Sequence, residues 1–513
     1  MRRIAEALVM SAAVAGAVQA GTSAKPNILV ILADDLGYSD IGCYGSEIPT
    51  PNLDKLATNG IRYTQMYNTS KCFPSRACLL TGNYFQHTNV KFNNAATAGE
   101  VLRPAGYSTW WVGKNHADFN PYDRGFDHFS GFLGGAINYY FPGGKDQNGK
   151  PVAGAIYKWA FDEKVVNPFM PEKPFYSTDT FTDWALEWLK ASGGSGKPWF
   201  LYVAYNAPHW PLQAHPEDIA KFKGVYDKGY DAIQNTRYQR QLASGLLDAA
   251  TAPLSAPDRE QWDALPAEKQ KQEAQRMEIY AAMIHTLDRN VGRLVTALKE
   301  SGQLDNTLIL FLSDNGAAAE DTEDDHADPA AVRGSGNSFD SIHGSWANVC
   351  NTPLRKWKLC SYEGGINTPM IAHWPKGIGK PGSICRETCH LIDLLPTWME
   401  LANAPFPGES KQTDIPPLEG VSLAPTFRGE AVKRSAPLFF EFGMGRAVRD
   451  GNWKLIRQGK SASWELYDMA ANRTETKDLA SQQPERVQEM TAEWEAWYKR
   501  CTGQDYGTKR KKK

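Results

Sequence analysis

Beyond its first twenty residues the 513-residue chain has no long apolar run, no dominant charge and no internal repeat. Without such a run, no membrane anchor is expected. The chain carries 56 Lys and Arg against 58 Asp and Glu, a net charge of −2. That balance provides no positive field for nucleic acid, so a nucleic-acid partner is not expected. The basic end, residues 506–513, is interpreted as a solvated tail.

The eight cysteines form no zinc-binding pattern. Cys385 and Cys389 are close in sequence, but no second pair accompanies them. Spacing alone does not establish which cysteines would pair in disulfides.

The first twenty residues differ in kind from the rest. Arg2 and Arg3 precede a short apolar run at 7–18. Val18 and Ala20 are small residues at the positions that a signal peptidase reads. This pattern predicts a secretory signal peptide over 1–20, and therefore a secreted or periplasmic protein.

The continuous apolar run at residues 27–33 is typical of a strand buried on both faces, and further strands are predicted at 107–112, 199–204 and 307–312. Polar side chains follow all four predicted strands: Asp34 and Asp35, Lys114 and His116, His209, and Asp314 and Asn315. Because parallel strands end at one edge of a sheet, where ligands bind, we expect these groups to meet there. Carboxylate and amide oxygens favour Ca²⁺ or Mg²⁺ over zinc.

Residues 72–82 read CFPSRACLLTG, and a helix is predicted after Ser75. Cys72 should therefore lie just before a helix N-terminus, where free backbone donors suit an anion. A cysteine with Pro, Ser and Arg at these offsets and a Leu-Thr-Gly close is a specific signature.

This signature resembles that of the type I, formylglycine-dependent sulfatases, arylsulfatase-like members of the alkaline phosphatase superfamily. The resemblance runs from Asn27 to about residue 500 and includes a Pro-His-x-Pro element at 208–211. A second signature lies at 355–366, where Lys358 precedes an aromatic-Glu-Gly-Gly motif. The chain departs from the family at Asn115, where the family usually has tryptophan.

The resemblance implies an alkaline-phosphatase-like α/β fold: a large mixed, mostly parallel sheet sandwiched by helices, with a smaller C-terminal antiparallel sheet plus helix. The catalytic domain is expected over 21–425 and the small α+β subdomain over 426–505.

The resemblance also implies a mechanism. A maturation enzyme converts Cys72 to formylglycine, whose hydrate attacks a sulfate ester. His209 protonates the leaving group, His116 accepts a proton as sulfate departs, and Arg76 offers a planar fork to oxyanions or to the hydrate. Lys114 and Lys358 bind the sulfate. The implied metal ligands, for Ca²⁺ or possibly Mg²⁺, are Asp34, Asp35, the modified Cys72, Asp314 and Asn315.

The substrate implied by family analogy is a sulfated carbohydrate. His343 and Trp346 are candidates either for lining its pocket or for packing within a loop, and residues 139–141 for stacking on a sugar. The acidic run at 320–325 is expected to be solvated.

Three other functions are open at this point. Some phosphonate monoester and phosphodiester hydrolases share this fold and signature. The chain could instead bind sulfated glycans without turnover if Cys72 stays unmodified. Cys72 could also act as a thiol nucleophile, although two adjacent carboxylates would activate it poorly.

Overall fold

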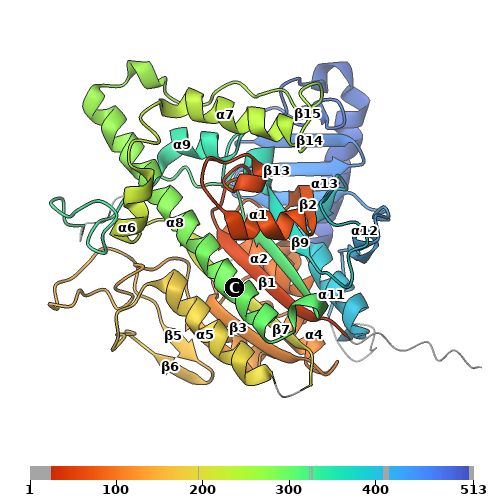
Figure 1. The fold of residues 1–513 in the computed structure, drawn as a ribbon. Coiled ribbons are helices and arrows are strands. Elements are labelled where there is room, and N and C mark those ends of the chain that lie inside the picture. The colour runs from red at the N-terminus through yellow and green to blue at the C-terminus, as the bar shows by residue number, and fades with distance from the viewer. Residues whose placement is uncertain (1–24, 194–195, 323, 325–326, 408–414, 508–513) are drawn as a thin grey trace, which may run out of the picture.

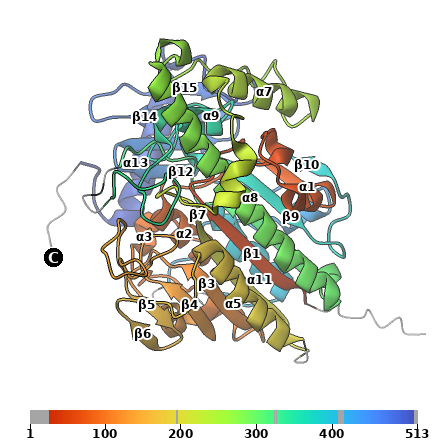
Figure 2. The same cartoon turned by 60° about the vertical axis from the view of Figure 1, so that its left-hand side comes forward.

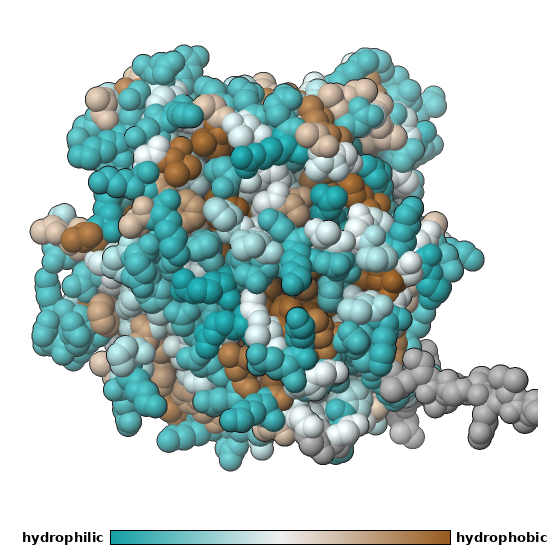
Figure 3. Space-filling view, in the orientation of Figure 1, coloured by the Kyte–Doolittle hydropathy of each residue, from teal (hydrophilic) through white to brown (hydrophobic). Residues whose placement is uncertain are grey.

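The structure, a computed structural model, describes residues 25–193, 196–322, 324, 327–407 and 415–507 (Figure 1). The predicted signal peptide and residues 508–513 of the basic tail lie outside these ranges. Within them, no helix combines the length and apolar character needed to cross a membrane. The face drawn in Figure 3 is mainly hydrophilic, with apolar residues in scattered patches. All eight cysteines are described, and none forms a disulfide.

A mixed sheet forms the centre of the molecule. Its strands follow the order β10-β2-β9-β8-β1-β7-β3-β4-β5-β6, and β11 also pairs with β2. Strand β1 is parallel to β7 and β8, and β3 continues the parallel part beside β7. The strands are β1 (Asn27–Asp34), β2 (Ile61–Tyr67), β3 (Ser108–Lys114), β4 (His128–Phe132), β5 (Trp159–Phe161), β6 (Lys164–Val166), β7 (Trp199–Pro208), β8 (Thr307–Ser313), β9 (Asn367–His373), β10 (Ser383–Cys385) and β11 (Cys389–His390).

Helices cover both faces of this sheet (Figures 1 and 2). Alternate residues of β1 enter two different cores: Ile28 packs with α2 and α11, and Leu29 packs with α1, α5 and α8. This double burial explains the unbroken apolar sequence of β1. The helices are α1 (Pro51–Thr58), α2 (Cys72–Thr81), α3 (Phe85–Thr88), α4 (Ala98–Leu102), α5 (Ser177–Ser192), α6 (Pro216–Ile219), α7 (Gly229–Ala243), α8 (Ala267–Glu300), α9 (His343–Cys350), α10 (Glu363–Ile366), α11 (Leu394–Ala402), α12 (Ala424–Phe427) and α13 (Pro484–Thr502).

A second, antiparallel sheet lies near the C-terminus, in the order β12 (Leu438–Phe442), β13 (Gly445–Asp450), β14 (Trp453–Gln458), β15 (Glu465–Asp468). Buried charges join it to the second signature. Lys454 Nζ lies 2.8 Å from Glu363 Oε1 and 2.7 Å from Glu475 Oε1. The expected large mixed sheet and small antiparallel sheet with a helix are both confirmed.

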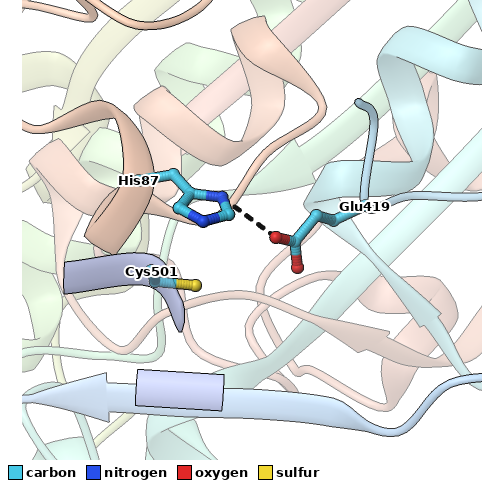
Figure 4. A group of neighbouring side chains, drawn as sticks. All are labelled: His87, Glu419 and Cys501. Carbon is cyan, nitrogen blue, oxygen red and sulfur yellow. Dashed lines mark ion pairs between the residues drawn. The ribbon is translucent and has the colours of Figure 1, made fainter. Parts of the chain in front are cut away.

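Helix α13 is attached to the main unit by a half-buried ion-pair group (Figure 4). Glu419 Oε1 lies 2.9 Å from His87 Nδ1, and Cys501 lies beside them. Such a group could hold a metal ion, but Arg500 donates to both oxygens of Glu419, at 2.7 and 3.2 Å. Because Arg500 already neutralises the carboxylate, we interpret the group as a structural ion pair.

Candidate active site

The polar residues that follow the central parallel strands meet at one edge of the main sheet. Asp34 ends β1, Lys114 ends β3, and His209 follows β7. Asp314 directly follows β8. Asp35 has a positive φ of 66°, which turns the chain sharply as it leaves β1.

Each buried carboxylate at this edge has a cationic partner. Lys114 forms a short ion pair with Asp34, and Lys358 Nζ lies 2.8 Å from Asp35 Oδ2. Arg76 Nη2 lies 2.7 Å from Asp314 Oδ2. The two lysines come from β3 and from the loop before α10, so segments distant in sequence converge on one cluster of charges.

The electrostatic balance differs between the two acids Asp35 and Asp314. Burial by itself would raise the pKa of Asp35, but Lys358, His209 and Lys114 together outweigh burial and hold the pKa below its usual range. For Asp314, burial and the negative charge of Asp34 outweigh Arg76 and raise the pKa to about 6. Asp314 therefore takes up a proton at a higher pH than Asp35.

The residues present fit a hard cation. Asp34 Oδ1 and Asn315 Oδ1 are buried and accept no hydrogen bond from any described residue. Asn315 Nδ2 donates to Asp35 Oδ1 at 2.6 Å, which brings the amide against the carboxylates. A buried set of carboxylate and amide oxygens suits Ca²⁺ or Mg²⁺. His209 adds a nitrogen within 4.8 Å of Asp34 and Asp35 oxygens.

Cys72 is the first residue of α2 and is 1% exposed. Burial raises the pKa of its thiol, and this effect exceeds the opposing one of Lys114 and Lys358. An unmodified Cys72 is therefore a protonated, poorly activated thiol, which argues against the thiol-nucleophile alternative.

His209 presents Nε2 to the charged cluster. Its Nδ1 lies 2.6 Å from the carbonyl oxygen of Trp210, so Nδ1 carries the proton and donates it. Its Nε2 lies 3.4 Å from Lys358 Nζ and 3.5 Å from Asp35 Oδ2. Burial, together with Lys358, lowers the pKa of His209 to about 3. The imidazole is thus neutral at neutral pH in the free protein.

His116 contacts Phe73, the residue that follows Cys72 in α2. The rings of His116 and Phe73 meet edge to face, with centroids 5.6 Å apart. Burial, with Lys114 and Arg76 nearby, lowers the pKa of His116 well below its usual value. His116 is therefore also neutral, and a neutral imidazole can accept a proton.

The expectation that the whole acidic run is solvated is wrong for Glu320. Its Oε2 accepts hydrogen bonds from Lys358 Nζ and Trp210 Nε1, both at 3.0 Å. Its Oε1 lies 3.3 Å from Lys71 Nζ. No periodic pattern in the sequence distinguishes Glu320 from its acidic neighbours, because only the path of the loop brings it to Lys358.

Two predicted pocket residues lie away from the charged cluster. His343 begins α9 and pairs with Asp321 at 3.0 Å, not with a residue of the cluster. Trp346 is fully buried and packs against Tyr230, so its interpretation as a pocket residue is wrong. Helix α9 buries this indole in the core beside α7 and α8.

Comparison with known proteins agrees with this architecture. The sulfatase family model matches residues 26–404, and the model for the C-terminal region of N-sulphoglucosamine sulphohydrolase matches 357–499. An arylsulfatase of Klebsiella aerogenes is 35% identical, covering 83% of this chain and 97% of its own. An uncharacterized sulfatase of Schizosaccharomyces pombe is 34% identical, covering 92% and 93%.

The solved structure of Ps i-CgsB in complex with k-i-k-neocarrahexaose has a TM-score of 0.69 and 29% identity, covering 92% of this chain and 93% of that one. The match over most of the catalytic unit, with sulfatases as relatives across nearly the full length, establishes the activity class. The chain belongs to the sulfatase family of the alkaline phosphatase superfamily and is a sulfuric ester hydrolase.

Proposed function

We propose that this sulfatase hydrolyses a sulfate ester on a carbohydrate, using formylglycine made from Cys72 by a maturation enzyme and a bound Ca²⁺. The observation that carries the proposal is the convergence of Cys72, two lysines and an oxygen-rich group at one sheet edge. The carbohydrate class is supported by the complex of the related Ps i-CgsB with neocarrahexaose. Export through the predicted signal peptide would place the enzyme with extracellular glycans.

The metal-binding residues in this proposal are Asp34, Asp35, Asp314 and Asn315, with the modified side chain of residue 72. A bound Ca²⁺ would supply positive charge that polarises the S–O bonds. One hydroxyl of the hydrated aldehyde would attack sulfur and give its proton to a ligand carboxylate, Asp314.

Lys114 and Lys358 hold sulfate oxygens and offset the charge that grows during attack. Among the described residues Lys114 Nζ donates only to Asp34, so it keeps N–H groups for the sulfate, whereas Lys358 must give up one of its contacts. Arg76 is fully buried against Asp314 and keeps that acid in position. His116 accepts the proton that is released as sulfate leaves.

His209 protonates the leaving oxygen. Lys358 and Lys114 contribute to its low pKa. A bound sulfate offsets both charges, so substrate binding raises the pKa toward the range of a useful acid.

His209→Ala should slow alkyl sulfate esters about 10²- to 10⁴-fold but slow 4-nitrophenyl sulfate much less. A poor alkoxide leaving group needs the proton, whereas nitrophenolate departs without it. The comparison measures kcat for both ester types in the variant and in His215→Ala. His215, which pairs with Asp179 at 2.8 Å, is a matched control outside the cluster. Equal losses on both ester types would contradict the acid role.

The pKa of about 6 at Asp314 predicts a pH-dependent metal affinity. Ca²⁺ needs the charged carboxylate, so below pH 6 a proton competes and affinity should fall up to about tenfold per pH unit. Above pH 7 it should level off. Calorimetric titration of chelator-treated protein at pH 5, 6 and 7.5 measures this. The Asp314→Asn variant should bind Ca²⁺ weakly at every pH, and its affinity should no longer fall below pH 6. If the affinity of this variant still fell as in the wild type, the pH dependence would belong to another group.

The phosphonate or phosphodiester hydrolase alternative is not favoured, because the family models and the full-length relatives are those of sulfatases. A glycan-binding protein without turnover differs from the proposal in one measurable way. The tryptic peptide carrying Cys72, from protein made with a maturation enzyme, should have the mass of the aldehyde. An unmodified thiol under these conditions, with no hydrolysis of 4-nitrophenyl sulfate, would favour the binding protein.

A further inference from the structure

The ammonium group of Lys358 has no spare donor in this structure. Its Nζ contacts Asp35 Oδ2 at 2.8 Å, Glu320 Oε2 at 3.0 Å and His209 Nε2 at 3.4 Å. An ammonium has three N–H groups, so a sulfate oxygen can bind Lys358 only if one contact is given up. The Asp35 side chain is 2% exposed, whereas that of Glu320 is 23% exposed. Glu320 is therefore the contact that faces the approaching substrate.

Contacts around Trp210 place Glu320 on the leaving-group side of the site. Trp210 directly follows His209, the proposed acid that protonates the leaving oxygen, and its indole N–H donates to Glu320 Oε2. The half-buried Trp210 ring meets Phe339 with centroids 5.8 Å apart. A leaving group next to His209 thus meets an aromatic surface and one carboxylate.

The carboxylate of Glu320 carries a stable charge. Although burial alone would raise its pKa, Lys358, Lys71 and the hydrogen bond from Trp210 together outweigh burial and lower the pKa to about 2. Lys71 holds the other oxygen at 3.3 Å. When a sulfate oxygen takes over the N–H that Lys358 gives to Glu320, the carboxylate loses part of this compensation. It can then repel a second anion and accept a hydrogen bond from a neutral donor.

We propose that Glu320 determines specificity for the leaving group: it accepts a hydrogen bond from a neutral donor beside the sulfate ester and repels leaving groups that carry a second anion there. The substrate class is then a carbohydrate with an isolated sulfate next to a free hydroxyl or amide, rather than one with an adjacent carboxylate or sulfate. This inference rests on the proposed function.

The test uses two aryl sulfates that differ mainly in one charge, 2-carboxyphenyl sulfate and 2-carbamoylphenyl sulfate. The ratio of kcat/KM, amide over carboxylate, is measured for matured wild type and Glu320→Gln. Comparing ratios between enzymes cancels the difference in intrinsic reactivity of the two esters. We expect Glu320→Gln to lower this ratio by about tenfold or more, because the repulsion is removed.

Three controls identify the cause. Glu320→Asp keeps the charge and should keep most of the wild-type preference. Asp321→Asn removes the next acid of the same run, whose side chain is 77% exposed, and should leave the ratio unchanged. The mass of the Cys72 peptide in each preparation corrects for differences in maturation.

The outcomes separate this inference from the proposed function. If neither enzyme hydrolyses either ester or 4-nitrophenyl sulfate although Cys72 is modified, the proposed function is wrong. If wild type hydrolyses the amide ester but Glu320→Gln has the same ratio, Glu320 does not set specificity. A similar fall of the ratio in Asp321→Asn would also overturn the inference, because it would point to general surface charge.

Discussion

Cys72→Ala should lower the hydrolysis of 4-nitrophenyl sulfate by at least about 10⁴-fold, since losing a nucleophile removes the reaction path itself. Alanine fits the start of α2 and has high helix propensity, so the fold should persist. The measurement is kcat under conditions in which wild type is fully matured. Circular dichroism and the thermal midpoint report whether the variant remains folded.

Cys78→Ala provides the matched control. Cys78 lies in the same helix and is also fully buried, but it packs in the apolar core rather than at the charged edge. The Cys78→Ala substitution should lower the stability slightly, because a small buried truncation costs little of the total stability. It should leave kcat within about twofold of the wild-type value. Residual activity of Cys72→Ala close to that of Cys78→Ala would show that residue 72 does not supply the nucleophile.

Arg76→Met should destabilise the protein by about 3–5 kcal/mol, the usual cost of leaving buried charges without their partner. Arg76 is fully buried, with Nη2 2.7 Å from Asp314 and 3.8 Å from Asp34, and Nη1 3.3 Å from the Tyr202 hydroxyl. Methionine fills similar space but leaves the carboxylates uncompensated. Urea unfolding of metal-free protein, followed by tryptophan fluorescence, measures the change in unfolding free energy.

Excess Ca²⁺ should recover part of this loss, because the ion would neutralise the same carboxylates. The control is Arg103→Met, whose half-exposed guanidinium lies 3.8 Å from Asp127. That substitution should cost no more than about 1 kcal/mol. A comparable small cost for Arg76→Met would mean that the charged cluster does not depend on Arg76 for its stability.

The central strands were predictable because a strand that is buried on both faces has a continuous run of apolar residues. Strands β1, β7 and β8 contain unbroken apolar runs. The polar residues that follow these runs mark the edge of the sheet at which the strands end. The outer strands have a weaker apolar pattern in the sequence. Strand β2 was not predicted: half-buried residues such as Gln65 interrupt its buried ones at irregular spacing, and its register shifts between Tyr63 and Met66. Strands β5 and β6 have three residues each, too few to establish a period.

The predicted active-site groups lie together in space, but their pairing was not readable from the sequence. That Lys114 pairs with Asp34 while Lys358 pairs with Asp35 depends on the ends of strands and loops that are far apart along the chain. Glu320 illustrates the same limit. Its acidic neighbours suggested a solvated run, yet the loop after β8 folds back and places this one carboxylate against Lys358 and Trp210.

By itself, the sequence determined the sulfatase signature, the mixed sheet and the identity of the groups at its edge. These follow from local patterns: unbroken apolar runs, turn residues and motif spacing. Only the tertiary structure decided which charges pair, that Trp346 belongs to the core, and that Glu320 contacts Lys358. Those outcomes depend on burial and on distances between segments hundreds of residues apart, and no local pattern encodes such distances.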